Sequence, residues 1–192
     1  MINFSEVNKN LALKLMLVHV AIIAFSNYIV QFPLEIFGIK AAWAMFTFPL
    51  VLVATDLTTR LTNKHQARAV VGLAFIPAAI ISGAIADWRI GFASAFAYLV
   101  GQLFDVTVFQ RIREKFTAWW AAPFAASIIS NIVDTYVFFG TAFHNGNNEY
   151  MAANWLAVAN ADVVFKIVVS LLIILPTYGI LLNYLQKRVQ QD

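Results

Sequence analysis

The stretch WWAAPFAASIISNIVDTYVFFGTAF, residues 119–143, is long and apolar enough to cross a lipid bilayer. A helix that spans the hydrocarbon core needs about 20 mostly apolar residues. The same stretch places an amide, Asn131, and a carboxylic acid, Asp134, one helical turn apart. It therefore raises two questions: which class of protein this is, and why polar groups lie where burial in lipid is costly.

The composition of the whole chain answers the first question. Of its 192 residues, 61% are hydrophobic and 12% are charged, and the mean hydropathy is +0.74, far from the usage of soluble domains. Apolar windows of spanning length recur at about 11–31, 41–59, 69–86, 89–109, 119–143 and 158–185. The sequence therefore predicts an all-α integral membrane protein, with six transmembrane helices in one bundle and one domain, residues 1–192.

The basic residues predict the orientation of that bundle, because lysine and arginine accumulate in cytoplasmic loops. One predicted side carries only Lys40 and Arg89. The other side carries Lys9, Lys14, Arg60, Lys64, Arg68, Arg111, Arg113, Lys115, Lys187 and Arg188. Both termini are therefore predicted to be cytoplasmic. The asymmetry also accounts for the net charge of +3, so we expect a lipid bilayer around the protein and no nucleic acid partner.

Polar side chains recur inside the predicted helices, although a charged group at the bilayer centre costs about 2.5 to 3.5 kcal/mol. They include Asn27, Asp56, Gln102, Asp105, Asn131, Asp134, Asp162 and Lys166. In the last three windows, 89–109, 119–143 and 158–185, which we call helices 4, 5 and 6, the polar residues form pairs three or four positions apart. The members of each pair therefore share a helix face. The pattern predicts that these helices present polar groups to the interior of the bundle.

Small residues recur every four positions before two of these polar groups. Helix 4 has Ala93, Ala97 and Gly101 before Asp105, and helix 5 has Ala122, Ala126 and Ser130 before Asp134. Such stripes let helices approach closely in lipid. Because the two helices run in opposite directions, we expect Asp105 in the cytoplasmic half and Asp134 in the outer half, as in a polar path that reaches both leaflets.

A purely structural role is the alternative for each of these groups. Polar side chains often hydrogen-bond helices together, and Asp162 with Lys166 could be a self-sufficient ion pair. For the whole set this alternative is weaker, because a structural bundle does not need ionisable groups in four helices. Asp56 and Arg60 fit either a gate that opens when the pair separates or an ordinary interfacial salt bridge.

The sequence lacks the motifs of zinc proteases, serine hydrolases and nucleotide-binding enzymes. It contains no H-E-x-x-H or G-x-S-x-G motif, no phosphate-binding glycine loop and no cysteine, and its three histidines lie in different segments. Paired aspartates could serve an intramembrane aspartyl protease, but Asp105 and Asp134 are predicted to lie at different depths. We therefore expect no enzyme, no metal site and no cofactor.

Five stretches of the sequence closely resemble the queuosine precursor transporters, a bacterial inner-membrane family earlier grouped with vitamin uptake transporters. They are FSNYIVQFP (25–33), FPLVLVATDLTTR (48–60), RIGFASAFAYLVGQLFDVTVFQRIR (89–113), SNIVDTYVFF (130–139) and DVVFKIVVSLLIILPTYG (162–179). They occur in the same order over nearly the whole chain. The connection before Arg89 is shorter here than in some relatives, so a role as a lid is in doubt.

The resemblance implies uptake of 7-deazaguanine bases, chiefly 7-cyano-7-deazaguanine and 7-aminomethyl-7-deazaguanine, which the cell builds into transfer RNA. It carries over as functional positions Asn27, Asp56, Arg60, Arg89, Gln102, Asp105, Asn131, Asp134, Asp162 and Lys166. Among these, Asp56, Arg60 and Arg89 are candidates for gating, and the other seven for substrate binding. It also implies a multi-pass protein of the inner membrane.

A guanine-like base makes physical sense of these residues. It offers two adjacent N–H donors, which a carboxylate accepts in a bidentate manner, beside a carbonyl that needs a donor. Asp134 with Asn131 supplies both, while Gln102 and Lys166 can contact further edges. Candidates for stacking on the flat ring are Tyr28, Trp43, Phe46 and Phe48.

Other functional classes stay open at this point. The main alternative is a substrate-capturing membrane subunit of an ATP-driven vitamin or nucleobase importer. Such subunits typically dock through an Ala-x-x-x-Ala pattern in their first helix, which LALKLMLVHVAIIAFSNYIV (11–30) lacks. A structural or assembly protein is a third class. Aspartate, histidine or lysine could relay protons, a facilitator would need no coupling, and the small-residue stripes would also suit a homo-oligomer.

Overall fold

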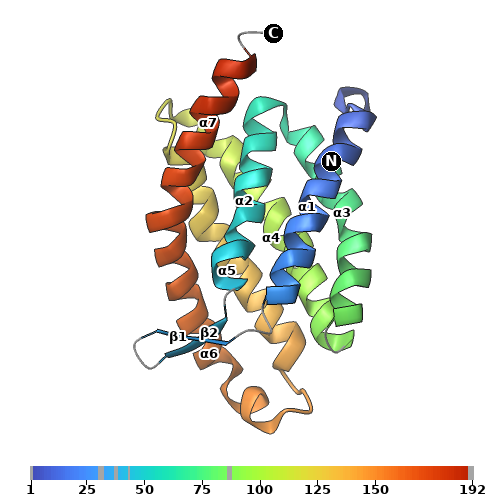
Figure 1. Ribbon diagram of the computed structural model, residues 1–192, viewed down its shortest axis with the longest axis vertical. Helices are drawn as coiled ribbons and strands as arrows, with labels where there is room; N and C mark the ends of the chain where they lie inside the picture. Colours follow the sequence, from blue (N-terminus) through green and yellow to red (C-terminus); the bar gives the residue numbers. More distant parts are fainter. Residues whose placement is uncertain (1, 30–32, 37–38, 43, 86–87, 190–192) are drawn as a thin grey trace.

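The computed structural model describes residues 2–29, 33–36, 39–42, 44–85 and 88–189. A short 3-10 helix, η1 (Phe4–Glu6), precedes the helical bundle. The bundle is formed by α1 (Lys9–Ile29), α2 (Ala44–Leu61), α3 (Lys64–Ile85), α4 (Trp88–Lys115), α5 (Ala121–Phe143) and a last rod of α6 (Glu149–Val169), the π-helix η2 (Ser170–Ile174) and α7 (Leu175–Val189). Consecutive members run in opposite directions, and α1 begins at the end of the bundle where α7 finishes (Figure 1).

Five of these segments are long and apolar enough to cross a membrane: Lys9–Ser26, Lys64–Ile85, Trp88–Lys115, Ala121–Phe143 and Glu149–Tyr184. They coincide with five of the six predicted windows. The remaining window, 41–59, corresponds to α2, which is shorter than the others in the bundle and lies beside them (Figure 1). The protein is therefore a multi-pass helical membrane protein with five identified spans.

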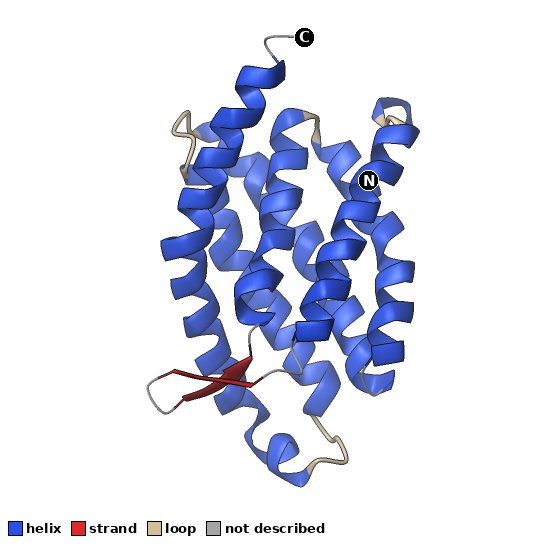
Figure 2. Ribbon diagram, viewed as in Figure 1, coloured by secondary structure: helices blue, strands red, loops and turns tan. Residues whose placement is uncertain are grey.

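A two-stranded hairpin departs from the all-α prediction. Strand β1 (Pro33–Ile36) pairs antiparallel with β2 (Ile39–Ala42), with Pro33 opposite Ala42. The hairpin lies at the end of the bundle opposite the C-terminus (Figure 2). The window 41–59 was predicted to be helical from its first residue, but the strand occupies positions 41 and 42, and the helix begins at Ala44. Between the two apolar windows, Pro33 and Gly38 interrupt any helical pattern in the sequence.

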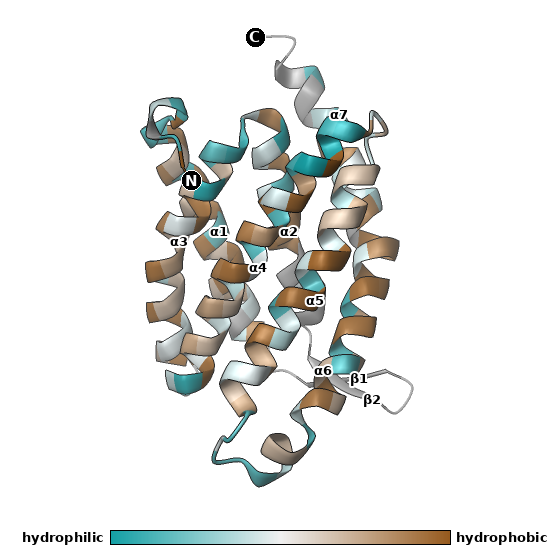
Figure 3. Ribbon diagram, turned by 180° about the vertical axis from the view of Figure 1, so that it is seen from behind, coloured by the Kyte–Doolittle hydropathy of each residue, from teal (hydrophilic) through white to brown (hydrophobic). Residues whose placement is uncertain are grey.

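Hydrophobic residues predominate along the middle of the helices, and hydrophilic residues gather at the two ends of the bundle (Figure 3). Large aliphatic side chains such as Leu17, Ile80, Leu172 and Ile180 are more than 60% exposed. In water such a surface would be unfavourable, because burial of apolar area drives folding by about 25 cal/mol per Å². In a bilayer these side chains face lipid, which agrees with the membrane assignment.

Helices α4 and α5 pack against each other more extensively than any other pair of described elements. The reason lies in the small-residue stripes, since Ala93, Ala97, Ala122 and Ala126 are all buried. At Gly101 an added Cβ would lie 3.0 Å from the Cβ of Asp134. Glycine at this position thus lets α4 approach α5 beside Asp134, as the stripes predicted.

The turn between α5 and α6 has clear local causes. Asn145 takes a φ of 54°, a left-handed conformation that asparagine tolerates, and the N–H of Gly146 donates to the carbonyl of Phe143 at 2.9 Å. Asn148 then caps α6 by accepting a hydrogen bond from the N–H of Met151 at 3.0 Å. The last helix therefore begins at Glu149 and not at about residue 158, where its apolar window starts.

Candidate functional site

Lys166 of α6 is the centre of a polar cluster between α5 and α6. Its Nζ lies 3.3 Å from Oδ2 of Asp134 and 3.0 Å from Oδ2 of Asp162, and it donates to Oγ1 of Thr135 at 3.2 Å. Thr135 in turn donates to Oδ2 of Asp162 at 3.3 Å. We call these four residues the lysine cluster. Its lysine side chain is 12% exposed, whereas the two carboxylates are 34% and 32% exposed, so the carboxylates are open to a solute.

Asn131 lies one turn from Asp134 on α5 and faces the same rod. It is buried, and its Nδ2 donates to Oγ of Ser170 at 2.9 Å. Ser170 opens the π-helix η2, in which the N–H of Leu175 reaches the carbonyl of Ser170. Pro176 directly follows and has no N–H to donate to the preceding turn. Wide turns of this kind often occur at functional sites, and here one adjoins Asn131.

Two further carboxylic acids, Asp56 of α2 and Asp105 of α4, lie deeper in the protein. They are 2% and 0% exposed, and their carboxyl groups lie within hydrogen-bonding reach of each other. Oδ1 of Asp105 accepts a hydrogen bond from Oγ of Ser130 at 3.1 Å. We call Asp56 and Asp105 the aspartate pair. Through Ser130 and its neighbour Asn131, the pair is linked along α5 to the lysine cluster.

Gln102 joins α4 to α2 beside the aspartate pair. Its Oε1 accepts a hydrogen bond from Oγ1 of Thr55, which also donates to the carbonyl of Val51. Both Gln102 and Thr55 are buried. The amide therefore lies within the polar interior that its spacing from Asp105 predicted.

The structure places the predicted gating arginines at the two ends of the bundle. Arg60 donates from Nη1 to the carbonyl of Trp119 at 2.9 Å, and in this conformation no ion pair joins it to Asp56 among the described residues. At the opposite end, Arg89 donates to the carbonyls of Thr141, His144 and Asn145. Arg89 thus holds the C-terminal end of α5, whose carbonyls have no partners within the helix.

The remaining predicted residues lie away from these clusters or outside the described part of the chain. Tyr28 is exposed near the end of α1, and Phe46 is half-buried near the start of α2. Trp43, and the side chains of Asn27 and Phe48, lie outside the described residues. The stacking position therefore stays a prediction.

An open polar cavity of about 570 Å³ lies between η1, the α2–α3 turn and the last turns of α4. Its lining includes Glu6, Thr59, His65, Arg113 and Glu114. Arg113 donates to the carbonyl of Thr59 at 3.2 Å. Thr59 lies one turn from Asp56 on α2, so the cavity approaches the aspartate pair from the end that carries most basic residues.

Hydroxyl groups are the functional candidates that sequence reasoning did not single out. Thr55, Ser130, Thr135 and Ser170 each bond to one of the predicted polar residues. Serine and threonine are common in membrane helices, where they bond to the carbonyl one turn earlier, so their presence alone carries little signal. Their positions beside Gln102, Asn131 and Asp134 were the available hint.

The polar contacts form a connected route through an otherwise apolar bundle. Along α5, Asp134 and Thr135 belong to the lysine cluster, Asn131 bonds to Ser170, and Ser130 bonds to Asp105 of the aspartate pair. The polar cavity lies one turn of α2 beyond Asp56, at Thr59. Carboxylates, amides and an ammonium group along such a route can hold a small solute with several donors and acceptors.

Comparisons with known proteins agree with this geometry. The family described as "Putative vitamin uptake transporter" matches residues 85–181, which contain α4, α5 and most of the last rod. No solved structure matches the chain.

Two curated relatives extend the similarity to the rest of the chain. The "Queuosine precursor transporter" of Escherichia coli (strain K12) is 39% identical over 97% of this chain and 93% of its own length. The "Probable queuosine precursor transporter" of Haemophilus influenzae is 34% identical over 90% of this chain and 86% of its own length. These shares include both polar clusters.

Proposed function

The chain belongs to the queuosine precursor transporter family, and from that membership we propose that it imports 7-deazaguanine bases across the bacterial inner membrane. The proposed substrates are 7-cyano-7-deazaguanine and 7-aminomethyl-7-deazaguanine. The family names describe transport and not catalysis. Six spans are part of the proposal, with α2 as the sixth and both termini in the cytoplasm.

The observation that supports this function best is the lysine cluster beside Asn131. Asp134 has one oxygen held by Lys166 at 3.3 Å, and about a third of its side chain is exposed. We propose that its carboxylate accepts the two adjacent N–H groups of the base. The amide of Asn131, released from Ser170, would donate to the neighbouring carbonyl, and the ammonium group of Lys166 would serve a second acceptor.

Orientation of the base follows from the same contacts. Gly101 leaves the backbone of α4 close to Asp134, so α4 leaves no room for a flat ring on that side of the carboxylate. In the proposed mechanism, the base replaces the bonds of Lys166 and Ser170, and α6 and η2 then move relative to α5. A two-state rearrangement of this kind would expose the site alternately to each side.

The test is uptake of labelled 7-cyano-7-deazaguanine by cells that can neither make nor import it. Cells that express the protein should accumulate the label, and cells without it should not. We expect Asp134→Asn to lower the rate of uptake at limiting substrate by about 10- to 100-fold, because a hydrogen bond to a charged group contributes about 1.5 to 3 kcal/mol.

The matched control is Glu149→Gln, which neutralises an exposed carboxylate at the start of α6 and should leave uptake unchanged. Immunoblots of membranes must show equal amounts of each variant. Full uptake by Asp134→Asn combined with Asn131→Ala would contradict the recognition site. Absence of uptake by the parent protein would contradict the function itself.

The alternative function, a membrane subunit that captures substrate for a separate ATP-driven module, is not favoured. The relatives are named as transporters. Vesicles that contain only this chain distinguish the two functions. Uptake into such vesicles supports an autonomous transporter, whereas binding without uptake would support the capture subunit.

A further inference from the structure

The aspartate pair has a feature that base recognition does not explain. Asp56 and Asp105 are 2% and 0% exposed. They lie beside the hydrogen bond between Thr55 and Gln102 that joins α2 to α4, close enough to interact with each other. An ionised carboxylate has only acceptors, so two ionised groups cannot form a hydrogen bond with each other. One proton between them supplies the donor and removes the repulsion of two buried negative charges.

No cation takes the place of that proton in the surroundings of the pair. The arginines of the neighbouring helices each donate elsewhere: Arg60 of α2 to the carbonyl of Trp119, Arg68 of α3 to Oγ1 of Thr107, and Arg113 of α4 to the carbonyl of Thr59. Helix α5 contributes the neutral Ser130. Arg60 therefore attracts Asp56 from a distance without forming an ion pair among the described residues.

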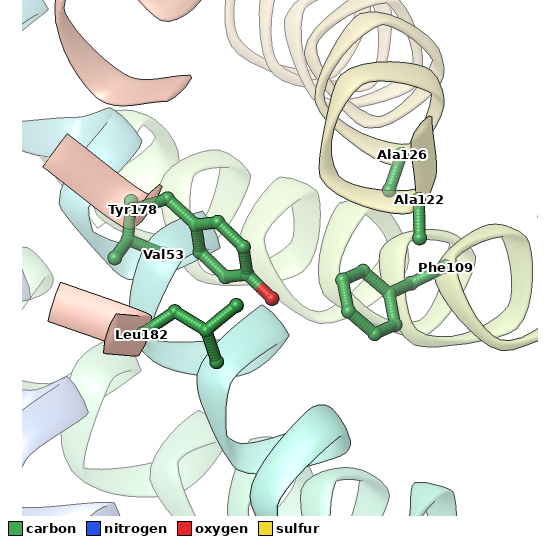
Figure 4. Close-up of a cluster of buried hydrophobic side chains, with 6 residues drawn as sticks. All are labelled: Val53, Phe109, Ala122, Ala126, Tyr178 and Leu182. Atoms are coloured by element: carbon green, nitrogen blue, oxygen red, sulfur yellow. The ribbon is translucent and has the colours of Figure 1, made fainter. Parts of the chain in front are cut away.

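Three buried oxygens at this place have no hydrogen-bond partner among the described residues: Oδ1 of Asp56, Oδ2 of Asp105 and the hydroxyl of Tyr178. Tyr178 is 1% exposed, and its hydroxyl points from α7 into the bundle toward Phe109 (Figure 4). It lies close enough to Asp56 and Arg60 to interact with both electrostatically. The ring of Tyr178 packs in an apolar cluster with Val53 and Phe109 (Figure 4). Unpaired buried polar groups are rare and costly, so the unpartnered oxygens of the two aspartates are the ones that a proton would satisfy.

We propose that Asp56 and Asp105 form a proton-binding site whose loading and release couple substrate import to the movement of one proton. The inference rests on the proposed function for its substrate but on separate residues. Ser130, which donates to Asp105 and precedes Asn131 in α5, connects this site to base recognition. The polar cavity near Thr59 provides the side from which the proton leaves.

The transport test uses vesicles that contain only the purified protein, with the membrane potential clamped to zero. With one proton carried per neutral base, an inward gradient of one pH unit should concentrate labelled 7-cyano-7-deazaguanine about tenfold. Asp56→Asn should exchange labelled for unlabelled base but reach no more than equal concentrations. Glu149→Gln, which alters an exposed carboxylate at the start of α6, should behave as the parent protein.

Equal accumulation with and without the proton gradient, or accumulation driven by a sodium gradient instead, would overturn the proposal. So would gradient-driven accumulation by Asp56→Asn. If the parent protein exchanges no base under any condition, the proposed function is wrong, and the proton site is judged by a second measurement.

That second measurement needs no substrate. Infrared spectra of the purified protein at neutral pH should show the carbonyl band of a protonated carboxylic acid. Asp56→Asn and Asp105→Asn should each lose this band, because the remaining carboxylate then accepts from the new amide. The control variant Glu149→Gln should retain it. Absence of the band from the parent protein, or its persistence in both variants, would refute the shared proton.

Discussion

Lys166 is the residue on which the lysine cluster depends. Its ammonium group lies between two carboxylates from different helices, Asp134 and Asp162, and it therefore joins α5 to α6. An ion pair inside a protein contributes little net stability, but removal of one partner is costly because the other charge is left uncompensated. The stability of this link between α5 and α6 therefore depends on what else contacts the two carboxylates.

Substitution of the lysine tests this role. We expect Lys166→Met to lower the melting temperature of the purified protein in detergent, because Asp134 and Asp162 then repel each other. The loss should be smaller than the about 3 to 5 kcal/mol typical of buried pairs, since both carboxylates are about one-third exposed. Adding Asp162→Asn should restore part of the melting temperature.

Lys187→Met serves as the control, because this lysine is exposed on α7. Its melting temperature should match that of the parent protein. Identical losses for the single and the double variant would show that charge repulsion is not the cause.

Close helix packing is the feature that matters at the scale of the element. The pair α3 and α4 approaches so closely that a Cβ added to Gly91 would lie 2.5 Å from the backbone nitrogen of Gly83. Only Gly91 must lack a side chain for this approach, since a Cβ on Gly83 meets no atom within 4 Å. The hydrophobic effect does not draw helices together in lipid. Small residues at such contacts instead allow close van der Waals packing between the helices.

This asymmetry predicts different outcomes for two identical substitutions. Gly91→Ala should destabilise the protein by about 1 to 3 kcal/mol, because backbone must move to admit the methyl group. Gly83→Ala should be neutral or stabilising by up to about 1 kcal/mol, from the better helix propensity of alanine. Melting temperatures in detergent measure both, and equal effects would contradict the packing described.

At the scale of the whole molecule, the two ends of the bundle differ in their polar residues, and this difference predicts a direction of transport. The end with both termini carries most of the basic residues and the polar cavity, and the hairpin lies at the other end (Figure 1). If the basic end is cytoplasmic, the lysine cluster lies toward the outer side and the aspartate pair toward the inner side. Substrate would meet base recognition before the proposed proton site.

Cysteine labelling tests this arrangement without background, because the chain has no cysteine of its own. In intact cells, a membrane-impermeant thiol reagent should label Lys40→Cys in β2 and Asn147→Cys in the α5–α6 turn. Thr62→Cys, at the opposite end of α2 from the hairpin, should be labelled only after the membrane is made permeable. Labelling of Lys40→Cys and Thr62→Cys from the same side would show that α2 does not cross.

The sequence by itself determined the class of the protein and the residues of interest. The spanning windows could be predicted because a bilayer requires a certain length of apolar helix. The polar pairs around Gln102, Asn131 and Asp162 could be predicted because spacing within one helix decides which residues share a face. The sequence also marked α4 and α5 as helices that can approach others closely, because small residues leave a local signature, and the structure shows that they approach each other at Gly101. The sequence did not predict the hairpin or the start of α6 at Glu149. Both depend on the conformation of turn residues, which hydropathy windows do not describe.

Only the tertiary structure decided which polar residues meet. Asp134 pairs with Lys166 across helices, Asp56 approaches Asp105 instead of pairing with Arg60, and Ser130 and Ser170 enter the polar route. Spacing along the chain fixes which face of a helix is polar, but the rotation and depth of one helix against another depend on the packing of the whole bundle. That packing brings the two polar clusters to opposite ends of a single route through the membrane.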